Sequence, residues 1–257
     1  MDLQLKKSLF IITGASSGLG NAIAKSLAQE GAKVIAVARR GEKLLQLEIE
    51  FHDNIEVIVG DILETSTQDK IIKLVDGRKI SGVLLNAGGP PATSALETTM
   101  PEWDNAYKQV FRWKVEFLNK LLPLMLPNAY GRILFIESFS VKQPVPNLAM
   151  SNAMRMAVVG YAKTLANEIA PKGLTVNIIA PGFHKTDAIK RVITKQSQTQ
   201  GIAYDDAYAK STGQIPVGFM GDAADLASFA TWLFSPYSRY ITGQTFVLDG
   251  GVIKSTF

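Results

Sequence analysis

The sequence contains no cysteine and only two histidines, His52 and His184. The absence of cysteine excludes a disulfide framework and any site built on thiolate ligands. A zinc centre takes three or four ligands from the protein, and two histidines far apart in the sequence do not supply them. We therefore expect no metal ion.

Targeting and membrane segments are also missing. No apolar stretch approaches the roughly 20 residues needed to span a bilayer. The residues at positions 2, 4, 6 and 7 are polar or charged, which is not the pattern of a signal peptide. The net charge is only +4, and the basic residues are scattered rather than gathered into a tail or stripe. We expect a cytoplasmic protein that binds neither membranes nor nucleic acids.

Short apolar segments alternate with segments of helical apolar spacing along the whole chain. The expected strands lie at 9–12, 34–38, 55–59, 83–85, 133–136, 175–179 and 245–248. Helical spacing covers about 22–28, 42–51, 67–75, 101–125, 150–170 and 222–234. This alternation predicts an α/β fold with a seven-stranded parallel sheet and helices on both faces.

The region 183–215 interrupts this rhythm. It is polar, most of all over 195–200, with short amphipathic pieces around 188–193 and 203–209. An insertion of this length in a compact fold usually acts as a lid or a binding loop. We expect it to cover the site and to carry substrate specificity.

The segment TGASSGLG, at 13–20, joins the first strand to the first helix. Gly14, Gly18 and Gly20 let the backbone turn tightly and approach a pyrophosphate, which the free N–H groups at the helix start would hold. Strand, turn, helix and strand follow one another within about thirty residues, the size of a βαβ unit. The sequence therefore predicts a dinucleotide site.

Two later strand ends add to this site. Asp61 follows the third strand, where a carboxylate can accept a hydrogen bond from an adenine amino group, although it could also be a helix N-terminal charge. The small residues of Asn86-Ala87-Gly88 end the fourth strand and would let a ribose lie against the backbone.

The end of the second strand indicates which nucleotide is chosen. Selection of NAD(H) places an acid there to bind the ribose 2′-hydroxyl. This chain has Ala38, Arg39 and Arg40 instead, and the planar donors of arginine suit a 2′-phosphate. We expect NADP(H) rather than NAD(H); the alternative is that both arginines only form a solvated helix start.

Five stretches together resemble the short-chain dehydrogenase/reductase family, especially its 3-oxoacyl-acyl-carrier-protein reductase branch. They are TGASSGLG (13–20), NAG (86–88), GRILFIES (131–138), VNIIAPGFHKTD (176–187) and YITGQTFVLDGG (240–251). The resemblance covers nearly the whole chain and implies a single doubly wound Rossmann domain over 1–257 that forms a homotetramer or homodimer. The implied cofactor-binding residues are Gly14, Ser16, Ser17, Gly18, Leu19, Gly20, Arg39, Arg40, Asp61, Ile62, Asn86, Ala87, Gly88, Arg155, Pro181, Gly182, His184 and Thr186.

The implied catalytic residues depart from the family pattern. The family uses a tyrosine as proton donor, a lysine four residues later, a serine thirteen residues before the tyrosine, and an asparagine in the preceding long helix. Ser138 stands at the serine position, but Ser151, Arg155 and Val110 stand at the other three. Ser151 to Arg155 resembles an atypical subgroup that carries Ser-Asn-x-x-Arg. The implied catalytic positions are then Ser138, Ser151 and Arg155, without the phenol that usually donates the proton.

Two interpretations of the groups near the missing phenol stay open, and one further residue, Tyr161, is not expected to replace it. His184, beside the implied nicotinamide site, could donate a proton near neutral pH, or be an exposed loop residue whose backbone alone touches the cofactor. Tyr161, ten residues after Ser151, should point away from the site into the core. Ser151 and Arg155 could instead form an anion or carboxylate subsite beside Ser138.

Two functions follow from these residues. The first is an NADP(H)-dependent oxidoreductase that acts on an alcohol or carbonyl substrate with a non-standard catalytic site. The second is a cofactor-binding homologue with little or no catalysis, serving as a sensor or structural subunit. Because the glycine turn and the strand ends around it are intact, cofactor binding is common to both.

Overall fold

A seven-stranded, all-parallel sheet forms the centre of the protein. The computed structural model describes residues 1–256, without the side chains of Ala188 and Lys195. The strand order is β3-β2-β1-β4-β5-β6-β7, which confirms the predicted sheet. The strands are β1 Leu9–Thr13, β2 Lys33–Ala38, β3 Ile55–Val59, β4 Ile80–Leu85, β5 Gly131–Ile136, β6 Leu174–Pro181 and β7 Thr245–Leu248.

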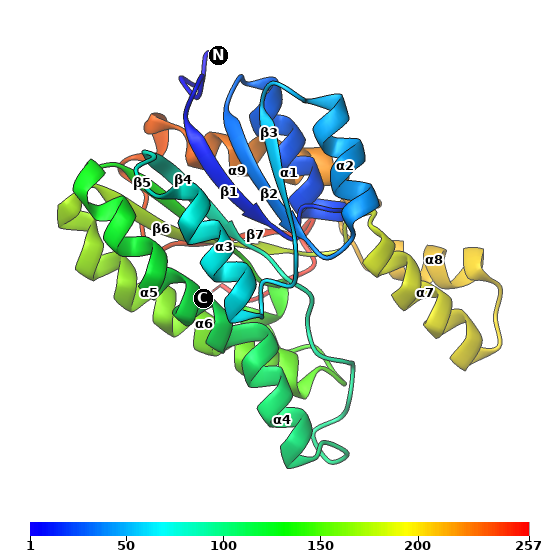
Figure 1. The fold of residues 1–257 in the computed structure, drawn as a ribbon. Helices are drawn as coiled ribbons and strands as arrows, with labels where there is room; N and C mark the ends of the chain where they lie inside the picture. Colours follow the sequence, from blue (N-terminus) through cyan, green and yellow to red (C-terminus); the bar gives the residue numbers. More distant parts are fainter. Residues whose placement is uncertain (257) are drawn as a thin grey trace.

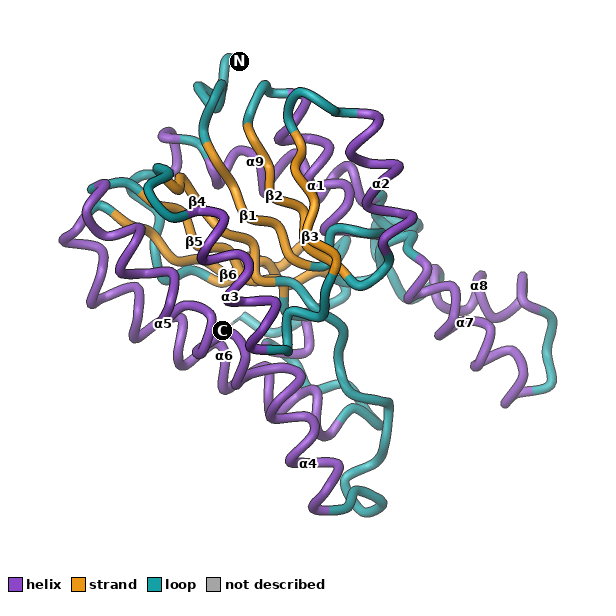
Figure 2. Tube along the Cα trace, viewed as in Figure 1, coloured by secondary structure: helices purple, strands orange, loops and turns teal. Residues whose placement is uncertain are grey.

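Helices cover both faces of this sheet (Figure 1). Side chains of α1, α2 and α9 pack on one face, and those of α3, α5 and α6 pack on the other. Figure 2 shows the strands as one layer between the two groups of helices. The helices are α1 Gly18–Gln29, α2 Gly41–Glu50, α3 Thr65–Val75, α4 Met100–Tyr107, α5 Trp113–Met125, α6 Ala149–Ile169, α7 Asp187–Gln200, α8 Tyr204–Thr212 and α9 Ala223–Phe234.

The apolar strands explain why both faces need a cover. Successive side chains of a strand point to opposite faces, so Phe10 and Ile12 of β1 join one core cluster while Leu9 and Ile11 join the other. Full burial of one such side chain contributes about 1.5–3 kcal/mol. A parallel sheet with continuous apolar strands is therefore stable only between two helical layers.

The long helix expected over 101–125 is interrupted. Between α4 and α5 the chain forms a π-helix over Lys108–Arg112. Val110, at the position of the family's asparagine, lies in this turn with 2% of its surface exposed. Turns of this type often occur at functional sites, and here the turn resets which side chains of α5 reach the sheet.

The expected lid at 183–215 is more ordered than its polar composition indicated. Residues 187–200, including the polar stretch after 195, form α7, which packs against α8 around a small cluster of Ile193, Ala207, Ile215 and Met220. The hydroxyl of Thr186 accepts a hydrogen bond from the Ile189 N–H and caps α7. Figure 1 shows the α7–α8 pair projecting from the body of the protein.

The strand order places a crevice at one end of the sheet. The chain runs from β1 outward to β2 and β3, then returns to β4 on the other side of β1. In parallel sheets of this kind, ligands bind outside the carboxyl ends of the strands where the order reverses. Here that point lies between β1 and β4. No helix in the described part of the chain is both long and apolar enough to cross a bilayer.

Candidate active site

A cavity of about 800 Å³ lies at the carboxyl ends of β1 to β4. Its volume falls within the range of about 300–1,000 Å³ that is usual for small-molecule and cofactor sites. Its lining includes thirteen of the residues that the sequence assigned to cofactor binding. The lining residues are Gly14, Ser16, Ser17, Gly18, Leu19, Val37, Ala38, Arg39, Arg40, Gly60, Asp61, Ile62, Leu63, Asn86, Ala87, Gly88, Gly89, Gln109, Thr186, Asp187 and Arg191.

The glycine turn after β1 brings backbone close to backbone. Gly14 has a φ of +66°, and a Cβ added there would lie 2.7 Å from the backbone oxygen of Asn86. A Cβ on Gly20 would lie 2.4 Å from the oxygen of Gly14. Both positions need glycine because a side chain would strain the φ angle or push the turn away from β4.

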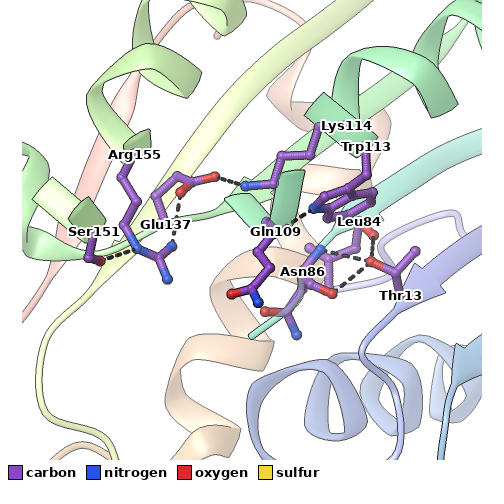
Figure 3. A network of polar contacts seen from close by, with 9 residues as sticks. All are labelled: Thr13, Leu84, Asn86, Gln109, Trp113, Lys114, Glu137, Ser151 and Arg155. Carbon is purple, nitrogen blue, oxygen red and sulfur yellow. Dashed lines mark hydrogen bonds and ion pairs between the residues drawn. The ribbon is translucent and has the colours of Figure 1, made fainter. Parts of the chain in front are cut away.

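Thr13 fastens this turn to β4. Its hydroxyl donates to the carbonyl oxygens of Leu84 and Asn86, at 3.1 and 2.8 Å, and accepts from the Asn86 N–H at 2.8 Å (Figure 3). The two donor distances describe one hydroxyl hydrogen shared between two acceptors. The sequence did not single out Thr13, although a buried hydroxyl at a strand end must find such partners.

The turn also leaves a place for a phosphate. Ser17 precedes α1 without making a side-chain cap, so the first N–H groups of the helix are available to an anion. Together with the missing side chains at Gly14 and Gly18, this geometry fits the pyrophosphate of a dinucleotide.

The two arginines after β2 are arranged differently from each other. Arg40 donates from Nε to the Ser16 hydroxyl at 3.2 Å and from Nη2 to the Ser17 hydroxyl. Arg39 lies 3.6 Å from the Asp61 carboxylate, whose other oxygen accepts from the Leu63 N–H. Both guanidinium groups therefore lie at the cavity rim, beside the glycine turn and the end of β3.

Some predicted cofactor residues lie outside the cavity lining. They are Gly20, Arg155, Pro181, Gly182 and His184. Gly20 acts by close packing, and a Cβ on Gly182 would lie 2.6 Å from Asp249. Gly182 and Pro181 belong to the junction of β6 with β7.

The interpretation of His184 as an exposed loop residue is wrong. Its exposed fraction is 6%, and its Nδ1 lies 3.2 Å from the Gly182 carbonyl oxygen. The ring packs against Gly221, where a Cβ would come within 3.0 Å of it. A ring held between these two segments supports the loop structure, and it is not among the residues that line the cavity. Its role as a proton donor stays a prediction.

Four polar side chains beyond the cavity form one linked chain. Lys114 of α5 donates to Oε1 of Glu137, Arg155 donates from Nη1 to Oε2 of Glu137 at 2.9 Å, and its Nε donates to the Ser151 hydroxyl at 3.1 Å. Figure 3 shows Glu137 between the two cations. The exposed fractions of the side chains are 4% for Lys114, 0% for Glu137 and 13% for Arg155.

Burial governs the electrostatics of this network. Desolvation lowers the pKa of Lys114, while the Glu137 carboxylate opposes that shift. Each oxygen of this buried carboxylate accepts from one cationic donor, so the carboxylate itself is fully paired. Arg155 is thereby held through two of its three nitrogens.

Lys114 and Glu137 were missed by the sequence-based prediction. Two signals could have found them. Glu137 is an acid directly after the fully buried β5, and Lys114 lies four residues after Val110 among the apolar positions that α5 turns to the sheet. A charge in either place requires a partner.

Three other residues that the sequence analysis considered lie on elements next to this network, namely Ser138, Asn152 and Tyr161. Ser138 follows Glu137, and its hydroxyl oxygen accepts from the Ser140 N–H at 3.1 Å, so its own hydrogen is available to another acceptor. Asn152 fixes the loop before α6 by bonding to the backbone of Val145. Tyr161 packs edge-on against Phe111 and belongs to the core margin, as expected.

A family model described as "Enoyl-(Acyl carrier protein) reductase" matches residues 14–253. The chain belongs to the short-chain dehydrogenase/reductase family. Curated relatives include the 3-oxoacyl-(acyl-carrier-protein) reductase FabG of Rickettsia bellii, 30% identical over 98% of this chain and 99% of the relative. The corresponding protein of Vibrio cholerae is 29% identical over 97% of this chain and 99% of that relative.

Solved short-chain dehydrogenases/reductases share the fold closely. L-sorbose reductase from Gluconobacter frateurii, complexed with NADPH and L-sorbose, superposes with a TM-score of 0.93 at 25% identity, covering 99% of this chain and all of that one. A putative NAD(P)-dependent gluconate 5-dehydrogenase from Beutenbergia cavernae with bound NADP gives 0.89 at 28%, with 99% and 100% coverage. The family therefore identifies this chain as an NAD(P)-dependent oxidoreductase in type.

Proposed function

We propose that this protein is an NADP(H)-dependent oxidoreductase that acts on an alcohol or carbonyl substrate. The observation that carries the proposal is the pair Arg39 and Arg40 at the rim of the cavity, next to the glycine turn. A 2′-phosphate on the adenosine ribose would lie there, and arginine binds phosphate through several directed N–H groups. The NADPH and NADP present in the two structural neighbours support the same cofactor.

The nucleotide supplies or accepts a hydride when bound, and the protein supplies the rest. Gly14, Gly18 and the start of α1 would hold the pyrophosphate, and Asn86 to Gly88 would form the wall for the second ribose. Ser138 would bind a substrate oxygen through its hydroxyl hydrogen, because its own oxygen already accepts from Ser140 and its hydrogen is not used.

The network around Arg155 also favours a second candidate, a cofactor-binding protein with little catalysis. General acid catalysis typically contributes about 10²–10⁴-fold, and a serine hydroxyl is a much weaker acid than a phenol. Arg155 is bonded to Glu137 and Ser151, whereas the lysine implied by the family resemblance would assist a tyrosine. We therefore expect slow turnover.

Two measurements test the proposal. NADPH and NADH are titrated into the purified protein by nucleotide fluorescence, and a panel of carbonyl compounds is screened for NADPH oxidation. We expect tighter binding of NADPH than of NADH and slow oxidation with some of the carbonyls. Failure to bind either nucleotide disproves the proposed function, while binding without turnover over a broad panel favours the second candidate.

A further inference from the structure

The hydrogen bonds of Arg155 leave one of its nitrogens free. Nε donates to Ser151 and Nη1 donates to Glu137, whereas Nη2 makes no hydrogen bond within residues 1–256. A Cβ added to Gly89 would lie 3.0 Å from this Nη2, and Gly89 lines the large cavity. The free nitrogen therefore lies beside the cavity wall, at a place where the chain has no side chain.

The charges of the network are not balanced. With Lys114 protonated, it and Arg155 carry two positive charges, and Glu137 carries one negative charge. Glu137 is the only carboxylate paired with either cation in the described part of the chain. Because unmatched charge in a largely buried place is unfavourable, one additional monoanion beside Nη2 would complete the network.

We propose that Arg155 binds a carboxylate of the substrate, so that the site takes an oxo acid or a hydroxy acid rather than a neutral carbonyl compound. The proposal deepens the proposed function and rests on it. The planar N–H donors of arginine match carboxylate oxygens. The Ser151 hydroxyl, whose oxygen already accepts from Nε, has its own hydrogen to donate to the same group.

The position of Arg155 separates this anion from the phosphates of the nucleotide. Those phosphates would lie at the turn between β1 and α1, which Arg40 contacts. Arg155 comes from α6 and is tied to the residue after β5. Lys114 and Glu137 are positioning residues: they hold the guanidinium in place and set the charge that the substrate meets.

The test compares acids with their neutral esters. Binding to NADPH-loaded protein is measured by calorimetry for 4-oxopentanoate and 2-oxobutanoate, each against its methyl ester, so that two carbonyl-to-carboxylate spacings are sampled. We expect at least one acid to bind about tenfold or more tightly than its ester, since about 1.4 kcal/mol corresponds to tenfold. Equal binding within both pairs, or no binding of either acid at millimolar concentration, overturns the proposal.

Variants identify the residue responsible. Arg155→Met leaves Glu137 paired with Lys114, and we expect its acid-to-ester preference to fall to about one. Lys114→Met removes a positive charge that never touches the ligand, and it should raise KM for the acid far more than it changes kcat. If Arg155→Met instead weakens NADPH and keeps the preference, Arg155 serves the cofactor and the proposal is wrong.

Two glycines provide a matched pair. Gly89→Ala places a methyl group 3.0 Å from Nη2, whereas a Cβ on Gly160, which lies in α6 outside the cavity lining, would meet nothing within 4 Å. Neither glycine has a positive φ, so neither substitution strains the backbone. We expect Gly89→Ala to reduce the acid-to-ester preference several-fold and Gly160→Ala to retain it.

Two controls separate the possible failures. The acid and ester comparison is repeated without nucleotide, so that a protein that does not bind NADPH still tests Arg155. Inorganic phosphate and propanoate are compared as competitors of the bound acid. If phosphate competes as strongly as propanoate, the site is assigned to phosphate esters, and the proposal that Arg155 binds a carboxylate is wrong.

Discussion

At the residue scale, Glu137 decides the local charge balance. It has no exposed side-chain surface and accepts from two cations. Glu137→Gln leaves Lys114 and Arg155 facing each other without a counter-ion, and breaking a buried ion pair in this way costs about 3–5 kcal/mol. We expect that loss in the free energy of unfolding, measured in urea.

The comparison for Glu137 is Lys114→Met. This change leaves the Glu137–Arg155 pair intact, so the loss should be clearly smaller. Adding Lys114→Met to Glu137→Gln should restore part of the stability, because one of the two opposed cations is removed. A double variant as unstable as the sum of the single ones would show that the two side chains do not interact.

Cofactor choice is also decided by single residues. Replacing Arg40 by Ala removes the guanidinium that bridges Ser16 and Ser17. A hydrogen bond to a charged group is worth about 1.5–3 kcal/mol, so the Kd for NADPH should rise about 10- to 150-fold while that for NADH changes little. Lys43→Ala, an exposed cation one turn further along α2, should leave both values unchanged.

At the scale of elements, the sequence predicted the regular parts well. Runs of mostly apolar residues mark all seven strands because a parallel sheet buries both faces of its inner strands. The π-helix at Lys108–Arg112 could not be predicted in this way, since it depends on how α4 and α5 meet α6 and the sheet. The helical state of 195–200 was missed because polar residues carry no apolar periodicity, and this segment is supported by α8.

The same distinction applies to the candidate site. The glycine turn and the two arginines are contiguous motifs, so the sequence revealed them. The network of Lys114, Glu137 and Arg155 joins α5, the end of β5 and α6, and no sequence spacing connects the three. The burial of His184 likewise depends on Gly221, which is 37 residues away (221 − 184).

The α6 helix can be used to test whether only the proton donor is missing. Ser151→Tyr with Arg155→Lys restores the implied pair at a spacing that shares one helix face. We expect little gain in carbonyl reduction, because Glu137 would bind the introduced amine. In the quadruple variant, Glu137→Gly and Lys114→Val are added to this double variant. They remove the carboxylate that would bind the introduced lysine and the ammonium that it would leave unpaired. We expect the kcat of the quadruple variant to be about tenfold or more above that of the double variant. Equal activity of the double and the quadruple variant would contradict the view that Glu137 withholds the introduced lysine from the tyrosine.

At the scale of the whole molecule, the pKa of Lys114 links stability to pH. Burial lowers this pKa from its ordinary value near 10.5. Between the lowered pKa and 10.5 the unfolded chain binds more protons than the folded one, so stability rises with pH through that window. At pH values below the lowered pKa, Lys114 is protonated in both states, and the folded protein bears the full desolvation cost of a buried ammonium.

The direction of this pH dependence can be measured by comparing the wild type with a variant that lacks Lys114. The free energy of unfolding of the wild type minus that of Lys114→Met should increase from pH 7 to pH 10, by at most about 1.4 kcal/mol per pH unit. Burial raises the pKa of Tyr130 and Tyr161, which lowers stability near the top of this range, but these groups are present in both proteins and cancel in the difference. A difference that stays constant, or falls with pH, would mean that the carboxylate of Glu137 outweighs desolvation. The ammonium would then be held as firmly in the folded protein as in water.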